Sequence, residues 1–248
     1  DAQESRGLGD VYKRQVQDTV GVESMMAIGA DCVNDQARLI LEDIEVTAFK
    51  CGVLGSLENI ATVAEIVGDY PDIPLIVDPI LSSGRGDELV DENMMKVMKE
   101  LLFPQSLIIT PNSYEARRFV IREDEEFIDI SLDECADRLK LYGCQNILIS
   151  GTHEQSDSVI NTFYSSSDQK IPYYWERLPD SYHGSGCTLA SAIAGCIARG
   201  LDIEEAIKEA QNFTWQTLKN AFKPGMGQYI PDRFFWINSD DDGKYTHH

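Results

Sequence analysis

The sequence has little positive charge and no long apolar run. Its 248 residues include 21 Lys or Arg against 42 Asp or Glu, which gives a formal net charge of −21 at pH 7. A chain this acidic repels phosphate backbones, so we expect no nucleic-acid partner. No stretch approaches the ~18 apolar residues of a membrane span, so we expect no membrane contact. A bound phosphate must therefore be held locally, by backbone N–H groups, a metal ion or a few basic side chains.

The six cysteines form no C-x-x-C pair, which argues against a zinc ribbon or a thioredoxin-like pair. They are scattered through apolar segments, a pattern typical of reduced, mostly buried thiols in a cytoplasmic protein. Residues 1–15 have neither the apolar core of a signal peptide nor any helix or strand periodicity. We predict that residues 1–15 are disordered and lie outside the fold, that one domain spans 16–238, and that the acidic residues 239–248 form a disordered tail.

Short apolar runs alternate with helical patterns along the chain. Continuous apolar runs, typical of strands buried on both faces, lie at 73–77, 106–110 and 146–150. Helical periodicity covers 34–43, 57–69, 92–102, 132–142, 187–199 and 203–222. This alternation predicts parallel βαβ units in a three-layer α/β/α sandwich. More polar, alternating segments at 158–164 and 173–178 predict antiparallel strands at one edge of the sheet.

Polar residues follow two of the predicted strands. Asp78 comes directly after the run at 73–77, and Asn112 and Glu115 follow the run at 106–110. Ligands of open α/β sheets bind beyond the carboxyl ends of the strands, where these residues are expected. Their oxygen atoms suit Mg²⁺ that keeps several waters and meets substrate phosphates. For any one of them, capping a helix or shaping an X-Pro turn is an equally good interpretation.

The segment HGSGCT at 183–188 opens a helix rich in small residues. Its glycines expose successive backbone N–H groups at a helix N-terminus, which binds anions and can stabilise a phosphoryl group in transfer. The thiol of Cys187 lies in the first helical turn, where cysteines ionise below their usual pKa of ~8.5, so it is a candidate base for a substrate hydroxyl. The alternative is an ordinary helix start with a buried cysteine. No Walker A motif occurs.

These motifs together resemble the hydroxymethylpyrimidine/phosphomethylpyrimidine kinases of thiamine biosynthesis, in the ribokinase-like superfamily. The resemblance runs from about Val16 to Trp236. It is carried by VQDTVGV (16–22), FKCGVLGS (49–56), VDPIL (77–81), SGRGDEL (83–89), ITPNSYEA (109–116) and LPDSYHGSGCTLASAIA (178–194). The last segment is the most specific, because the pyrimidine kinases carry a cysteine where the wider superfamily commonly has Asp.

The resemblance implies a role for each residue of the glycine-rich segment. Gly184, Ser185 and Gly186 would form the anion hole for the γ-phosphate of ATP. Cys187 would be the base that activates the hydroxymethyl oxygen of the substrate. His183 precedes the anion hole, where a role in loop packing is at least as good an interpretation.

The resemblance also implies the other parts of the site. Gln17 matches the glutamine whose amide reads the pyrimidine edge, and Val53 and Ile80 match apolar walls of the pyrimidine pocket. The implied cofactors are ATP and Mg²⁺. The residues that would organise them, with Mg²⁺ held through water, are Asp78, Asn112 and Glu115.

The sequence departs from the family pattern in three places. The family begins with a strand and a Gly-rich loop that form part of the pocket, and residues 1–15 match neither. We therefore expect a chain truncated at its N-terminus, with the first strand missing, marginal stability and little activity. The family's K-G-G-H reads Ser150-Gly151-Thr152-His153 here, without the lysine. The methionine usual at position 53 is a valine.

The sequence thus predicts a Mg-ATP-dependent kinase that phosphorylates 4-amino-5-hydroxymethyl-2-methylpyrimidine and then its monophosphate. The resemblance further implies a cytoplasmic enzyme that forms a homodimer when full length. Two alternatives stay open. One is a pyridoxal/pyridoxine kinase of the same fold, against which Gln17 and Cys187 favour the pyrimidine. The other is a non-catalytic nucleotide-binding remnant.

Overall fold

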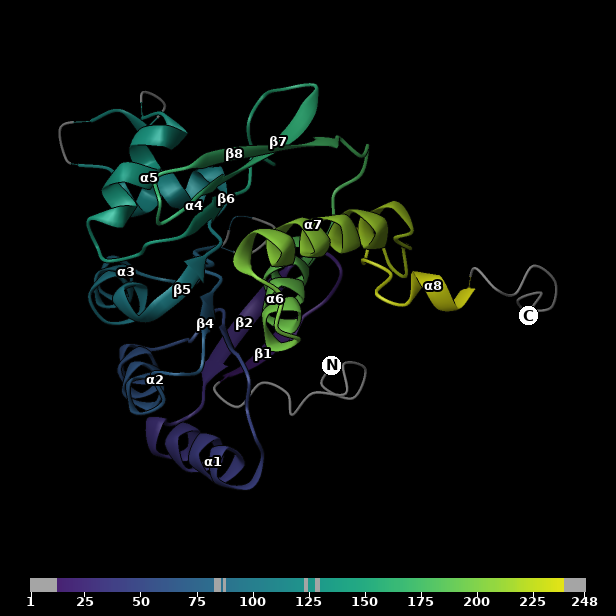
Figure 1. Ribbon diagram of the computed structural model, residues 1–248. Coiled ribbons are helices and arrows are strands. Elements are labelled where there is room, and N and C mark those ends of the chain that lie inside the picture. The colour runs from purple at the N-terminus through teal and green to yellow at the C-terminus, as the bar shows by residue number, and fades with distance from the viewer. Residues whose placement is uncertain (1–12, 83–85, 87, 123–124, 128–129, 239–248) are drawn as a thin grey trace, which may run out of the picture.

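The computed structural model describes residues 13–82, 86, 88–122, 125–127 and 130–238 (Figure 1). The strands are β1 Lys13–Gln17, β2 Val22–Ala27, β3 Phe49–Cys51, β4 Leu75–Val77, β5 Ser106–Ile109, β6 Ile147–Ile149, β7 Ser158–Tyr164 and β8 Lys170–Glu176. The α-helices are α1 Ala30–Asp43, α2 Leu57–Asp69, α3 Glu92–Val97, α4 Ser113–Val120, α5 Leu132–Lys140, α6 Ser185–Ala198, α7 Ile203–Lys219 and α8 Phe235–Asn238. A π-helical turn at Met98–Leu102 and a 3₁₀ turn at Phe103–Gln105 continue α3.

Six strands form one sheet in the order β3-β4-β5-β6-β7-β8. Neighbouring strands from β3 to β6 are parallel, whereas β7 and β8 pair antiparallel. The predicted mostly parallel sheet with an antiparallel hairpin at one edge is therefore confirmed. Within the described part of the chain, β3 is the edge strand at the other side.

The side chains of the central strands alternate between two cores. In β4, Leu75 and Val77 pack in one core with α2, α3, α4 and α5, while Ile76 packs in the other with α6 and α7. This follows from the strand geometry, in which successive side chains point to opposite faces. Helices therefore cover both faces of the sheet (Figure 1), as the predicted three-layer sandwich requires.

Local signals set where several helices begin. Side chains at the N-caps of α2, α3, α5 and α7 each accept a hydrogen bond from a backbone N–H in the first turn. These N-cap residues are Ser56, Asp91, Ser131 and Asp202. The helix predicted over 34–43 begins earlier, at Ala30, and the predicted helix over 57–69 is α2 with the same bounds.

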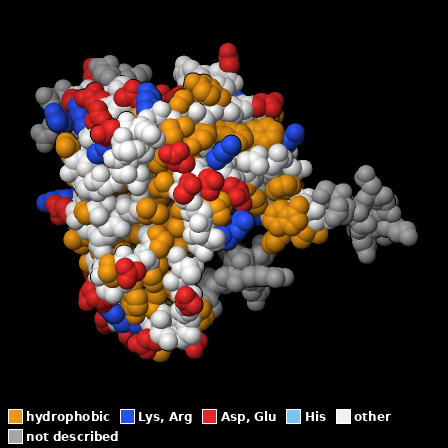
Figure 2. Space-filling model, viewed as in Figure 1, with side chains coloured by type: hydrophobic (Ala, Val, Ile, Leu, Met, Phe, Trp, Pro, Cys, Tyr) orange, Lys and Arg blue, Asp and Glu red, His pale blue; other side chains and the backbone are white. Residues whose placement is uncertain are grey.

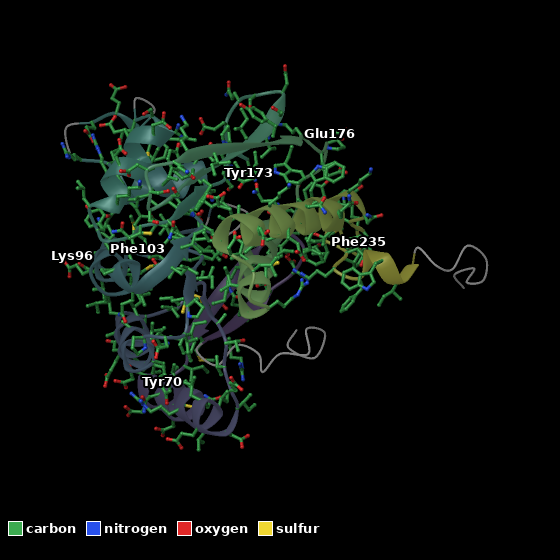
Figure 3. All side chains as sticks on the ribbon, in the orientation of Figure 1. Tyr70, Lys96, Phe103, Tyr173, Glu176 and Phe235 are labelled. Carbon is green, nitrogen blue, oxygen red and sulfur yellow. The ribbon has the colours of Figure 1, made fainter. Side chains whose placement is uncertain are left out.

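The second face of the sheet is tied to the C-terminal helices. The side chain of Tyr173, from β8, faces α7 (Figure 3), and Nε1 of Trp175 in the same strand donates to Oε1 of Gln211 in α7 over 3.0 Å. Trp215 of α7 donates from Nε1 to the backbone oxygen of Glu176 over 3.3 Å. The ring of Phe235, at the start of α8, lies 6.2 Å from that of Phe213 in α7. These contacts hold α7 and α8 in a fixed relation to the antiparallel edge.

Several apolar side chains near the C-terminus are exposed to solvent. Figure 2 shows hydrophobic side chains gathered over α8, where Trp236 and Ile237 are 47% and 59% exposed. None of the described helices is both long and apolar enough to cross a membrane.

The strands β1 and β2 form a separate antiparallel hairpin, with Lys13 opposite Ala27. The expectation that residues 1–15 lie outside the fold is therefore wrong for residues 13–15. The hairpin gave no clear sequence pattern because apolar residues such as Val16 and Met26 are 60% and 66% exposed. Residues 1–12 and the predicted tail 239–248 lie outside the described residues.

The turn of this hairpin docks on a C-terminal loop. Thr19 accepts hydrogen bonds from the backbone N–H of Gln228 at its carbonyl oxygen (2.7 Å) and of Gly227 at its Oγ1 (3.1 Å). A Cβ at Gly227 would lie 2.0 Å from the Thr19 oxygen, so only glycine fits this approach. The next residues of the loop pair with Tyr182 through Tyr229. Three distant parts of the chain thus meet next to the start of α6.

Candidate active site

The N-cap and the first residues of α6 form the glycine turn, which we define as residues 184–187. Gly184 is the N-cap of α6 with φ of 81°, a left-handed conformation that favours glycine. The backbone N–H groups that open a helix have no partner within it. With the partial positive charge of the helix end, they make this turn suited to an anion. The structure thus places the predicted residues Gly184, Ser185, Gly186 and Cys187 on one helix N-terminus.

The side chain of Cys187 is less buried than those of the four core cysteines. Cys187 is half-buried in the first turn of α6, whereas Cys196 is buried further along the same helix. Burial raises the pKa of the Cys196 thiol and raises that of Cys51, Cys135 and Cys144 to about 11. These four thiols stay protonated and serve packing. Cys32 is exposed, and it is the exception to the predicted mostly buried thiols.

The predicted pyrimidine-reading residue Gln17 lies next to the glycine turn. Its Oε1 is 3.3 Å from Nε2 of His183, the residue that precedes Gly184. The backbone N–H of His183 donates to the oxygen of Tyr229, so the C-terminal loop fixes this neighbourhood. Docking of the hairpin turn therefore brings Gln17, from β1, to the start of α6.

The predicted apolar walls lie at the carboxyl ends of neighbouring strands. Val53 follows β3 and is buried, and Ile80 follows β4 and is half-buried. The backbone N–H of Asp78 donates to Cys51 in β3, which holds these two strand ends side by side. Val53 and Ile80 therefore share the sheet edge of Asp78.

Two carboxylates and a lysine meet at the same sheet edge. Asp78 is 3% exposed, and its Oδ2 lies 3.4 Å from Nζ of Lys50 in β3. Glu115 is 5% exposed, and burial, together with the charge of Asp78, raises the pKa of Glu115 to about 8. We name Lys50, Asp78, Asn112 and Glu115 the carboxylate cluster. Lys50 was not predicted, because it lies within a strand and only the pairing of β3 with β4 brings it to Asp78.

Asn112 and Glu115 form a capping box at the start of α4. Asn112 Oδ1 accepts from the Glu115 N–H, and Glu115 Oε2 accepts from the Asn112 N–H, both at 2.8 Å. Glu115 Oε1 accepts from the N–H of Leu81 at 3.4 Å. The helix-capping interpretation of Asn112 is thus confirmed, and these oxygen atoms already have partners inside the fold.

The fit of a metal ion to the cluster rests on Asp78. Its Oδ2 is buried and accepts no hydrogen bond, although Nζ of Lys50 lies 3.4 Å away, so a water or a hydrated cation would complete its hydrogen bonding beside the ion pair. Among the described residues, no group of three or more His, Cys, Asp or Glu side chains is arranged to hold a metal ion. Asp78 fits Mg²⁺, whereas Asn112 and Glu115 would have to give up the capping box to bind it directly.

Two arginines hold the loop after β6, where this sequence lacks the lysine of the family pattern. Arg117 of α4 makes a two-pronged contact with Glu154, at 2.6 and 3.2 Å. Arg177, beyond β8, donates to the backbone oxygens of Thr152, Glu154 and Ser156, each at 2.9 Å. Neither arginine carried a sequence signal, because each acts across a long separation in the chain.

Comparison with known families shows to which family the chain belongs. The sequence matches the family described as phosphomethylpyrimidine kinase over residues 6–232. The chain belongs to this family. The match begins at residue 6, ahead of Val16, where the resemblance was expected to start.

Curated members of this kinase family cover most of the chain. The hydroxymethylpyrimidine/phosphomethylpyrimidine kinase of Bacillus subtilis is 29% identical over 230 residues, which span 92% of this chain and 84% of that protein. The thiamine biosynthesis bifunctional protein ThiED of Geobacter sulfurreducens is 32% identical over 213 residues, which span 85% of this chain. This match spans 43% of the bifunctional protein's length.

Solved structures of two kinases share the fold. The phosphomethylpyrimidine kinase of Clostridium difficile superposes with a TM-score of 0.68 at 24% identity, over 82% of this chain and 83% of that one. The ADP complex of Bacillus subtilis pyridoxal kinase gives a TM-score of 0.74 at 23% identity, over 85% and 78% of the two chains. These likenesses confirm the predicted ribokinase-like fold of the phosphomethylpyrimidine kinase family.

Proposed function

We propose that this protein transfers the γ-phosphoryl group of ATP to 4-amino-5-hydroxymethyl-2-methylpyrimidine and then phosphorylates the monophosphate, as a kinase of thiamine biosynthesis. The observation that carries the proposal is the position of Gln17 beside the glycine turn. One residue would read the heterocycle, and the turn next to it offers an anion site and a thiol. The names of the relatives in the family support the same substrate.

The glycine turn would supply the chemistry of phosphoryl transfer. The backbone N–H groups of residues 184–186 would hold the γ-phosphoryl oxygens as negative charge spreads over them. Cys187 Sγ, as the thiolate, would take the proton of the hydroxymethyl oxygen while that oxygen attacks phosphorus. The bond from phosphorus to the β,γ-bridging oxygen breaks, and ADP leaves.

The carboxylate cluster would face the phosphates of ATP. Asp78 would hold Mg²⁺, directly or through a water, and Lys50 would fix the Asp78 carboxylate. When bound, Mg²⁺ neutralises charge on the β- and γ-phosphates. Glu115 would act from behind Asp78 by holding α4 in place through the capping box, since its raised pKa keeps it mostly neutral at pH 7.

A direct comparison of heterocycles tests this proposal. ADP release is measured with hydroxymethylpyrimidine, with pyridoxal and with neither. We expect the highest kcat/KM for hydroxymethylpyrimidine, and a monophosphate that is itself a substrate. A higher kcat/KM for pyridoxal would favour the pyridoxal kinase alternative, to which the fold is equally suited. Binding of ATP with transfer to neither heterocycle would favour the non-catalytic alternative.

A further inference from the structure

A cationic side chain, Arg233, lies at the glycine turn. Arg233 stands just before α8, and its Nε donates to Oγ1 of Thr188 over 3.2 Å. A Cβ added to Gly184 would lie 3.4 Å from Arg233 Nη2. The guanidinium therefore lies against the backbone of the turn, although the two residues are far apart in the sequence.

Hydrogen bonds on both sides fix the position of Arg233. Thr188 Oγ1, which receives the Arg233 N–H, itself donates to the oxygen of Gly184 over 2.8 Å. The N–H of Asp232 donates to the backbone oxygen of Thr217 in α7 over 3.0 Å. Asp232 Oδ1 accepts from the N–H of Phe234 over 2.9 Å. The backbone is thus anchored to α7, and the side chain is anchored to the first turn of α6.

The charge of Arg233 is not balanced by the described part of the protein. Five other arginines pair with carboxylates, namely Arg38, Arg117, Arg118, Arg138 and Arg199, and Arg177 donates from all three of its nitrogens to backbone oxygens. Among the described residues no carboxylate pairs with Arg233, although the chain carries a net charge of −21. A cation stabilises the C-terminus of a helix, whereas Arg233 lies at the N-terminus of α6, where the helix dipole repels it. An anion between the two would turn this repulsion into attraction.

We propose that Arg233 binds the phosphoryl group in transfer, together with the N–H groups of the glycine turn. Its Nη1 and Nη2 groups donate to the phosphoryl oxygens, while Nε stays on Thr188. A planar guanidinium suits this task, because its paired donors match the oxygens of a phosphoryl group. This assignment rests on the proposed function and adds a residue to the same site.

The test compares variants at the two ends of α6. Arg233→Gln removes the charge at the glycine turn, and Arg233→Lys keeps the charge without the paired donors. Arg199→Gln is the matched control, because Arg199 follows the C-terminal end of the same helix and pairs with Glu209. Each variant is assayed for kcat, for KM of ATP, and for binding of inorganic pyrophosphate by calorimetry.

We expect Arg233→Gln to lower kcat about 100-fold, as the loss of one donor to a developing charge does. Pyrophosphate binding should weaken about tenfold, Arg233→Lys should recover part of both losses, and Arg199→Gln should match the unchanged protein. Equal kcat and equal pyrophosphate affinity in all four proteins would overturn the assignment. If the unchanged protein phosphorylates no heterocycle, the proposed function fails. Pyrophosphate binding then decides on Arg233 alone: a weakening specific to Arg233→Gln supports the assignment, and equal affinity refutes it.

Discussion

The proposed site has two parts that are built differently: the carboxylate cluster, here called the first or buried wall, and the glycine turn, here called the second or open wall. In the carboxylate cluster, Asp78 and Glu115 are almost completely buried, and the capping box uses the oxygens of Asn112 and Glu115 inside the fold. The glycine turn is open, with Gly186 exposed and Cys187 half-buried at the end of a helix. Residues of the first wall therefore serve stability and function together. In the second wall, Gly184 needs its left-handed φ, whereas the Cys187 side chain lies at the open end of the helix, so its substitution should affect turnover far more than stability.

The largest effect is expected at the open wall. Cys187→Ala should lower kcat by about 10²–10⁴, because it removes the proposed general base. The pyrimidine KM and the unfolding temperature should change little. Steady-state kinetics and a thermal melt on the same preparation measure all three quantities.

Two variants sharpen this prediction. Cys187→Asp should recover part of the turnover, since a carboxylate can also accept the hydroxyl proton. Cys196→Ala, on the buried side of the same helix, should lower stability and leave turnover unchanged. Near-full turnover in Cys187→Ala would remove the thiol from the mechanism.

At the buried wall we expect a smaller loss of turnover, accompanied by a loss of stability. Asp78→Asn removes the ion pair with Lys50, and we expect the free energy of unfolding to fall by about 1–3 kcal/mol. The loss stays below that for breaking a fully buried pair, because Lys50 is partly exposed. The Mg²⁺ concentration for half-maximal turnover should rise. Urea denaturation and a Mg²⁺ titration measure the two effects. Unchanged stability would mean that Asp78 serves the ligand alone and that the two walls do not differ.

The hairpin that carries Gln17 gives a third prediction. A Cβ in Gly227→Ala would lie 2.0 Å from the Thr19 oxygen, so the hairpin turn must move away. We expect the pyrimidine KM to rise about tenfold, or ~1.4 kcal/mol, with a smaller change in kcat. Gly195→Ala in α6 is the control, because nothing lies within 4 Å of its Cβ. If both variants keep the same KM, the hairpin does not position Gln17.

The smallest effect separates the two roles of the capping box. Asn112→Ala should lower the free energy of unfolding by about 1 kcal/mol, the usual value of an N-cap side chain. Glu115→Gln should cost less, because glutamine at this position can keep the bond to the Asn112 N–H. Urea denaturation of both variants measures the difference. A larger loss in Glu115→Gln than in Asn112→Ala would contradict this account of α4.

Elements with a regular apolar pattern were predictable, and those without one were not. A strand covered on both faces, such as β4, has to be apolar throughout, and α2 carries a regular apolar stripe behind its Ser56 cap. The hairpin of β1 and β2 has no such constraint. The helix α4 escaped prediction because an Asn and a Glu three residues apart serve equally as metal ligands or as a capping box.

The long-range partners of the site had no signal in the sequence. The residues of the glycine turn were predictable because they are neighbours in the chain, and their motif is local. Lys50 reaches Asp78 only through strand pairing, and Arg233 reaches the turn only through the docking of the C-terminal segment. No periodicity or spacing encodes contacts of this kind.

The contact between Thr19 and Gly227 also bears on the order in which the protein is made. The two residues are 208 positions apart, so Gln17 can reach His183 in its final place only after nearly all the described chain has left the ribosome. Closing a loop of this length is entropically costly and slow compared with local folding. The sheet can therefore form on the growing chain while the substrate pocket stays unfinished. We expect the capacity to bind pyrimidine to arise last, as a late event in the maturation of the polypeptide.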